Sequence, residues 1–222
     1  ASTNSSKREA IIRLMYGYKD IDLDLSFNYS KQVVMLEKID DWLLSNAYII
    51  IARKEFNEGN YSKARKTYER VKSLSNYNEG AEAAYFLIYF NYLDDNLDVA
   101  EKMVFDFSNE YNNDHFLAKA YLLLSDIYVI RNNNFQAKAT LESIIDNHTG
   151  KELVNIARRK LEDIIRKDIL DKNNISKDIY IDVLEDDIED DIDIFQDSLY
   201  LKEMNKIIID STNNIELNED KY

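Results

Sequence analysis

The sequence predicts an all-α protein whose helical hairpins stack into a solenoid. Between residues 45 and 170, turns rich in Asn, Asp and Gly recur at short intervals. They separate segments of about 14–17 residues in which apolar positions lie three or four apart, the period of an α-helix. The 222-residue chain has no proline and only four glycines, a composition that disfavours a β-sandwich with many turns. Short turns between helices predict antiparallel neighbours.

The helical segments also repeat. Ala64, Ala100 and Ala137 lie just inside the second helix of three successive hairpins, at spacings of 36 and 37 residues. A small residue where two helices cross lets their axes approach, and larger neighbours fill the remaining space. Such larger residues recur four and seven positions after each alanine: Tyr68 and Val71, Val104 and Phe107, Leu141 and Ile144. The pattern predicts hairpins at about 45–80, 81–117 and 118–150.

Further helical segments flank these three repeats. Residues 7–44 predict a degenerate hairpin, with one helix around Ile11 and a second over 29–44, separated by a turn at 20–24 that breaks the repeat register. Residues 151–170 predict one amphipathic helix that caps the solenoid. Its outer, solvated side carries the basic residues Lys151, Arg158, Arg159, Lys160, Arg166 and Lys167. We therefore expect a helical repeat domain over 1–170 and an acidic tail over 171–222.

The hairpins resemble the tetratricopeptide repeat (TPR), a helical hairpin of about 34 residues. The family's aromatic, Leu, small and Ala positions are occupied in the first repeat by Tyr48, Ile51, Ala52, Ala64 and Tyr68, and in the third by Tyr121, Leu124, Ser125, Tyr128, Ala137 and Leu141. The second repeat supplies Leu87 and Ala100 but has Ile88 at a small position. Asn76, Asn112 and Thr149 stand where the family has a terminal proline.

The resemblance is closer for one group within the family. The stretches 81–87, 117–128 and 135–147 are similar to the last repeats of long TPR proteins in the envelope of Gram-negative bacteria. This resemblance covers about residues 8–170. It implies that the chain is the C-terminal end of a longer solenoid, in the periplasm or at the periplasmic face of the outer membrane.

Charge is divided unevenly along the chain. The net charge is −14, and residues 171–222 alone hold 16 acidic and 5 basic side chains. A chain this acidic is repelled by phosphate backbones, so nucleic acid is not an expected partner. No apolar run approaches the ~20 residues of a membrane span, although association with a membrane complex stays open.

The acidic tail has two interpretations. A charge run of this kind is typical of a disordered extension. Alternatively, the segment orders on a partner or folds back on the solenoid, because one set of apolar residues recurs at helical spacing. The set that predicts tail contacts is Ile181, Leu184, Ile188, Ile192, Phe195 and Leu199. Alternation of Ile179, Ile181 and Val183 also allows a short strand.

The sequence gives little support for a catalytic site or a metal-binding site. The chain lacks cysteine, and its only histidines, His115 and His148, fall in predicted loops about one repeat apart. Asp20, Asp22 and Asp24 resemble the start of a calcium loop, but the turn glycine and the final Glu of that motif are missing. The acidic cluster at 185–191 predicts at most weak binding of divalent ions. The sequence thus predicts no catalytic, metal-binding or cofactor-binding residue and no cofactor.

One face of the first helices is the candidate binding surface. Tyrosines are expected there, and Tyr combines a large contact area with a polar tip and few rotamers, which suits peptide recognition. The predicted concave face consists of Asn46, Ile49, Arg53, Asn57, Tyr85, Tyr89, Tyr92, Lys119, Leu122 and Asp126. The competing interpretation is that this face packs on the chain's own tail or on neighbouring repeats. The basic face of 151–167 predicts a solvated cap or a dock for the tail.

These observations predict a non-catalytic scaffold or adaptor that binds other proteins. The resemblance implies that it is a subunit of a bacterial envelope assembly. The alternative is a structural spacer, in which the repeats extend a rod and present other domains. An enzyme is not expected.

Overall fold

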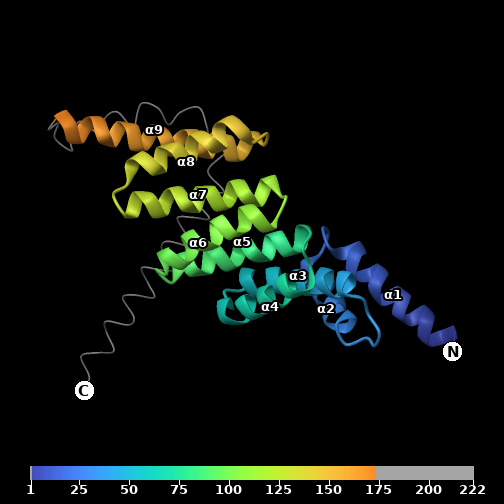
Figure 1. The fold of residues 1–222 in the computed structure, drawn as a ribbon. Helices are drawn as coiled ribbons and strands as arrows, with labels where there is room; N and C mark the ends of the chain where they lie inside the picture. The colour runs from blue at the N-terminus through green and yellow to red at the C-terminus, as the bar shows by residue number, and fades with distance from the viewer. Residues whose placement is uncertain (1, 174–222) are drawn as a thin grey trace, which may run out of the picture. The chain divides into compact units, whose positions relative to one another are not determined.

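The computed structural model describes residues 2–173, and the predicted all-α class is confirmed for them (Figure 1). The tail residues proposed to make contacts lie outside this part. Within it the helices are α1 (Ser2–Tyr18), α2 (Leu23–Val33), α3 (Asp41–Asn57), α4 (Tyr61–Leu74), α5 (Asn78–Leu93), α6 (Leu97–Glu110), α7 (Asp114–Ile130), α8 (Asn134–Asn147) and α9 (Lys151–Asn173). Residues up to Ile164 form one compact unit, which contains α1 to α8 and the first part of α9.

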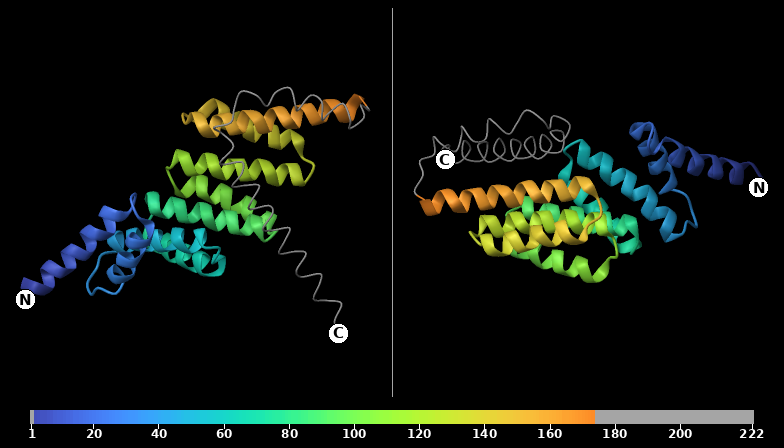
Figure 2. Two further views of the ribbon diagram at one scale, coloured as in Figure 1. Left: turned by 180° about the vertical axis from the view of Figure 1, so that it is seen from behind. Right: turned by 90° about the horizontal axis from the view of Figure 1, so that it is seen from above.

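Among residues 2–173, consecutive helices pair into four hairpins. α1 packs on α2, α3 on α4, α5 on α6 and α7 on α8 (Figures 1 and 2). Successive hairpins meet through α2 and α3, α4 and α5, and α6 and α7. The first helices also contact one another, α3 with α5 and α5 with α7. The stacked hairpins are the packing of an α-solenoid, and the row of first helices is its shared element.

The turn inside hairpins two to four has the same geometry each time. The second residue after the helix end has a positive φ: 75° at Gly59, 57° at Asp95 and 56° at Asn132. The next backbone N–H donates back into the helix, as Asn96 does to the carbonyl of Asn91 at 2.9 Å. Gly, Asn and Asp adopt this left-handed conformation at the least cost. The Asn- and Asp-rich turns of the sequence therefore set the length of each first helix.

The second helix of each hairpin buries three residues at i, i+4 and i+7. Every one of them is 2% exposed or less. They are Ser26, Ser30 and Val33 in α2, Ala64, Tyr68 and Val71 in α4, Ala100, Val104 and Phe107 in α6, and Ala137, Leu141 and Ile144 in α8. The predicted register is confirmed over 45–150. α2 continues the second-helix register at a slightly longer spacing. Across the turn at 20–24, however, the buried residues Ile11 and Met15 of α1 lie 15 and 11 positions before Ser26, one position off the repeat, so the predicted break is seen in the first helix.

The predicted second helix over 29–44 is wrong. α2 ends at Val33, and α3 begins only at Asp41. Asp40 caps α3 by accepting a hydrogen bond from the backbone N–H of Leu43 at 2.8 Å. Arg8 of α1 holds the connection in place, because its guanidinium donates to the carbonyls of Glu37 at 2.7 Å and Lys38 at 2.9 Å.

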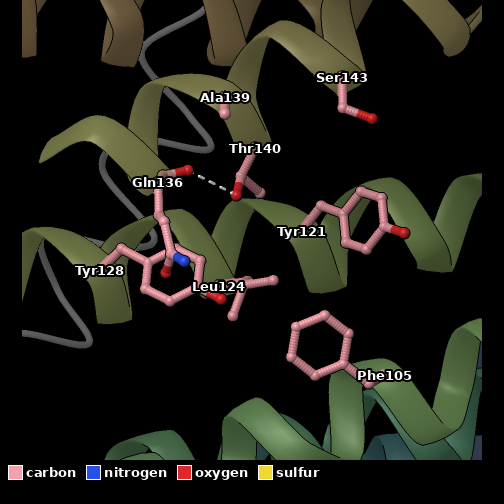
Figure 3. A pocket seen from close by; sticks show the side chains of 8 residues that line it. All are labelled: Phe105, Tyr121, Leu124, Tyr128, Gln136, Ala139, Thr140 and Ser143. Atoms are coloured by element: carbon pink, nitrogen blue, oxygen red, sulfur yellow. Dashed lines mark hydrogen bonds between the residues drawn. The ribbon is translucent and has the colours of Figure 1, made fainter. Parts of the chain in front are cut away.

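On its outer side, the fourth hairpin leaves a hollow of about 300 Å³ (Figure 3). Phe105 of α6, Tyr128 of α7 and Thr140 of α8 are among the residues that line it. Thr140 donates its hydroxyl to the carbonyl of Gln136 in its own helix at 2.8 Å, so this side chain does not extend across the hollow to α7.

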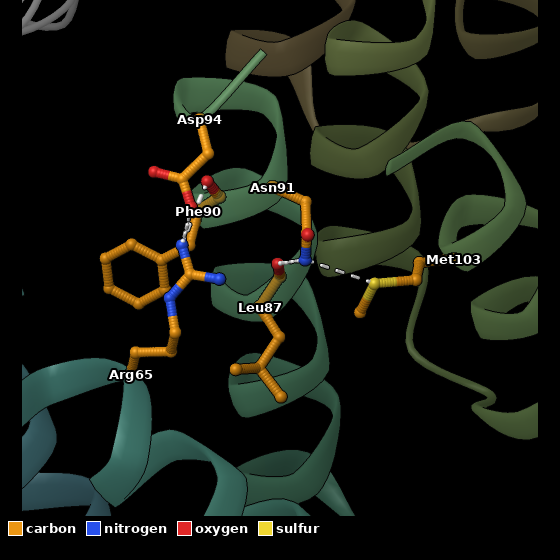
Figure 4. A network of polar contacts seen from close by, with 6 residues as sticks. All are labelled: Arg65, Leu87, Phe90, Asn91, Asp94 and Met103. Atoms are coloured by element: carbon orange, nitrogen blue, oxygen red, sulfur yellow. Dashed lines mark hydrogen bonds and ion pairs between the residues drawn. The ribbon is translucent and has the colours of Figure 1, made fainter. Parts of the chain in front are cut away.

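In the third hairpin a longer side chain fills the position equivalent to Thr140 (Figure 4). Met103 of α6 stands where Thr140 stands in α8, and the amide of Asn91 in α5 donates to its sulfur at 3.4 Å. Nearby, Arg65 of α4 donates to the carbonyl of Phe90 at 3.2 Å and forms an ion pair with Asp94. These contacts join α4, α5 and α6. No helix among the described residues has both the length and the apolarity to cross a membrane.

Candidate functional site

All ten residues of the predicted binding face lie on the row formed by α3, α5 and α7. Four of them are buried: Asn46 is 6% exposed, Ile49 1%, Tyr89 5% and Leu122 9%. The amide of Asn46 donates to the carbonyl of Trp42 at 2.9 Å in its own helix. These four side chains belong to the interior. The surface that remains consists of Arg53, Asn57, Tyr85, Tyr92, Lys119 and Asp126, which we call the first-helix face.

Arg53 connects α3 to α5 at one end of this face. Its Nε and Nη2 atoms donate to the two carboxylate oxygens of Glu82 at 2.6 and 2.5 Å. The Glu82 side chain is 8% exposed and that of Arg53 is 37% exposed. The hydrogen bonds that Arg53 donates to Glu82 raise the pKa of Arg53 against the opposing effect of burial. Sequence reasoning missed Glu82, although an acid with an alanine on each side is a readable signal of a buried, paired charge.

A cation–aromatic cluster connects α5 to α7. The rings of Tyr85 and Phe116 lie with centroids 5.7 Å apart. The Lys119 ammonium lies 5.9 Å from the Tyr85 ring and 6.0 Å from the Phe116 ring. Such contacts attract a cation to the face of each ring. Phe116 was missed at the sequence level, although its place three residues before Lys119 puts both on one side of a helix.

A third connection joins α7 to α9. Lys160 donates to Asp126 at 2.6 Å, and both side chains are about 30% exposed. The prediction that Lys160 lies on the outer side of the cap helix is therefore wrong. The negative charge of Asp126 acts on the phenol of Tyr92 in α5. Burial, with this carboxylate as the second cause, raises the pKa of Tyr92 to about 12, so the phenol stays neutral at physiological pH.

The isolated candidates for other chemistry have structural roles. Asp22 caps α2 by accepting from the N–H of Leu25 at 2.9 Å, and Asp24 pairs with Lys54. His115 is exposed at the start of α7, and its pKa is lowered by partial burial and then by Lys119 and His148. Among the described residues, no group of three or more His, Cys, Asp or Glu is placed to hold a metal ion.

The first-helix face is thus a surface of paired charges and tyrosine rings on a stack of helical hairpins. The stacked hairpins define the chain as an α-helical repeat protein, and the first-helix face is its candidate contact surface. The sequence matches no protein-family model, and a comparison with curated proteins finds no relative. The physical features of this face are therefore the basis for assigning a function.

Proposed function

We propose that the chain is a non-catalytic scaffold that binds other proteins through the first-helix face, and that its hairpins are of the TPR type. The observation that carries this proposal is the row of α3, α5 and α7, which contact one another and present Arg53, Tyr85, Tyr92 and Lys119 on one side. Tyrosine and arginine are among the residues that are enriched in protein interfaces.

The chemistry of the face supports a protein partner rather than a small substrate. Tyr85 and Lys119 present a ring and a cation held by neighbours, so little conformational freedom is lost when a partner binds. Stacked repeats also extend such a surface along their row, which suits an extended peptide. The proposed setting, by sequence resemblance alone, is an assembly at the periplasmic side of a bacterial outer membrane.

The experiment is affinity purification of the full chain from its native source, with quantitative mass spectrometry. The test variant is Tyr85→Ala with Tyr92→Ala. Tyr89 is left unchanged because it is 5% exposed and its loss would damage the core. Tyr77→Ala is the matched control, since Tyr77 is 78% exposed at the start of α5 and lies outside the face. Circular dichroism monitors helicity of all three proteins.

We expect a defined set of proteins to be recovered with the native chain and the Tyr77 variant, and to be depleted at least fivefold with the double variant. Equal recovery by all three helical proteins would refute binding through this face. Fractionation of the source cells tests the compartment separately.

A specific observation favours a second candidate, the structural spacer. Asn46, Ile49, Tyr89 and Leu122 are buried by the chain itself, and the ion pairs Arg53–Glu82 and Lys160–Asp126 satisfy charges within it. A spacer needs only such internal contacts. The spacer hypothesis predicts that no protein needs the first-helix face for binding. It also predicts that deletion of a whole hairpin shortens the distance that the chain spans within the assembly.

A further inference from the structure

The hollow of the fourth hairpin exists because one inter-helix contact is replaced there. In the second hairpin the hydroxyl of Thr67 donates across to Glu55 at 2.6 Å, and in the third the amide of Asn91 reaches Met103. Both contacts join residues twelve apart, one from each helix of the hairpin.

In the fourth hairpin the corresponding residues are Tyr128 and Thr140, and they bond elsewhere. The Tyr128 phenol donates to Glu101 of α6 at 2.9 Å, and Thr140 donates to Gln136 of its own helix. A threonine here is also shorter than the methionine of the third hairpin. The space bordered by α6, α7 and α8 therefore stays open (Figure 3).

The walls of the hollow are of two kinds. Three aromatic rings, of Phe105, Tyr121 and Tyr128, lie on the side of α6 and α7. Three polar side chains, of Gln136, Thr140 and Ser143, lie on the side of α8. Phe105 is 47% exposed, so one ring is accessible from solvent. A volume of about 300 Å³ is at the lower limit of ligand pockets, which suits one long side chain better than a cofactor.

The helices that border the hollow are acidic. Their acids are Asp98, Glu101, Asp106 and Glu110 of α6 and Glu142 and Asp146 of α8. The bases nearby are Lys72, Lys102, Arg131 and Lys138; Arg131 pairs with Asp98 and Glu101, and Lys72 pairs with Glu110. Acids therefore outnumber bases by six to four. By contrast, α4 carries five basic residues and one acid, so the sign of the charge is particular to this pair of outer helices.

We propose that the hollow binds an arginine side chain from a basic segment of a partner protein. The guanidinium stacks on the accessible aromatic rings, which attract a cation. Its N–H groups donate to the oxygens of the polar wall, and the acidic helices draw the basic segment toward the site. The site is separate from the first-helix face and does not depend on it.

The test uses the full chain and three short peptides. Their central residue is arginine, its neutral isostere citrulline, or norleucine, between Gly and Ser residues. Binding is followed by the NMR shifts of the Phe105 and Tyr128 ring protons, because both rings line the hollow. We expect saturable shifts with the arginine peptide, about tenfold weaker binding of the citrulline peptide, and none with norleucine.

The decisive variant is Thr140→Met, which introduces the residue that fills the same register in the third hairpin. We expect it to abolish the arginine-dependent shifts while helicity and stability are kept. Thr140→Ser is the matched control, because it keeps the hydroxyl and leaves the hollow open. Phe105→Ala, at a half-exposed position, is expected to weaken binding about fivefold.

Two results would overturn the proposal: unchanged arginine binding in a folded Thr140→Met variant, or a norleucine peptide that binds as tightly as the arginine peptide. Arginine-dependent shifts that are confined to residues outside the hollow would place the binding elsewhere on the chain and would overturn it as well. The recovery of proteins through the first-helix face is unaffected by Thr140→Met, so this proposal and the proposed function fail separately.

Discussion

Gly80 provides the sharpest test of how the second and third hairpins pack. It lies in the first turn of α5, directly against the end of α4. A Cβ placed on Gly80 would lie 2.7 Å from the carbonyl carbon of Ser75, even closer to its oxygen, and 3.3 Å from Cε1 of Tyr111. The carbonyl is backbone and cannot rotate away. Gly80→Ala must therefore push α5 away from α4.

The expected change in the free energy of unfolding of Gly80→Ala follows from two opposing effects. Alanine in place of glycine within a helix normally stabilises it by about 1 kcal/mol. Forcing an extra carbon into a packed contact costs about 1–3 kcal/mol, and here the nearest atoms are rigid, so the upper part of that range applies. We expect Gly80→Ala to lower the free energy of unfolding by about 2 kcal/mol. For a chain of this size the melting temperature should fall by about 4–8 °C.

The matched control is Gly17→Ala. Gly17 lies near the end of α1, and a Cβ there would meet nothing within 4 Å. The same chemical change should therefore stabilise the protein, by about 0.5–1 kcal/mol. Urea unfolding is followed by circular dichroism and by the fluorescence of Trp42, the single tryptophan. A Gly80→Ala protein as stable as the native chain, or more stable, would refute the close approach of α4 and α5.

The other predictions test individual contacts. Glu82→Gln should cost about 1–2 kcal/mol in urea unfolding, less than a fully buried pair because Arg53 is partly exposed; a loss below 0.3 kcal/mol (about the size of experimental scatter) would argue against the pair. Asp40→Ala should cost about 1 kcal/mol through loss of the α3 cap, while Asp41→Ala, which does not cap, should cost less. Tyr111→Phe should raise stability by about 1 kcal/mol, because the Tyr111 hydroxyl is buried without a hydrogen-bond partner in the described part of the chain. Burial, and secondarily Glu110, raises the pKa of Tyr111 to about 12. Since the unfolded chain loses this proton near pH 10, stability present below pH 10 should fall between pH 10 and 12, and less steeply in the Phe variant; identical slopes in the two proteins would contradict this.

The fold could be read from the sequence because its determinants are local. Ala64, Ala100 and Ala137 mark the places where helices cross, and each is fully buried. Turns that need a positive φ select Gly, Asn or Asp, which are visible in the sequence. Helical periodicity then fixes which side of each second helix is buried. These three signals act within one hairpin, so no knowledge of distant contacts is needed.

The candidate face was less predictable, because spacing places a residue on a side of a helix but does not reveal what covers that side. α3 and α5 are enclosed by helices before and after them, so nearly their whole circumference is apolar or small. Ile49 and Tyr89 share the predicted face and are buried. The sequence predicts Lys160 in solvent, yet it contacts Asp126, because its long stem allows the ammonium to reach a carboxylate on α7.

The first hairpin shows why hydropathy alone can miss a repeat. Ser26 and Ser30 occupy the registers of Ala64 and Tyr68, and a serine reads as a surface residue. Each is buried because its hydroxyl finds a carbonyl: Ser26 donates to Met15 of α1 at 2.8 Å, and Ser30 to Ser26 at 2.8 Å. Burial without such partners would cost about 1–3 kcal/mol per hydroxyl. At Ser26 the crossing of α1 and α2 thus requires a small side chain rather than an apolar one, and Ala64, Ala100 and Ala137 are the small residues at this position in the other hairpins.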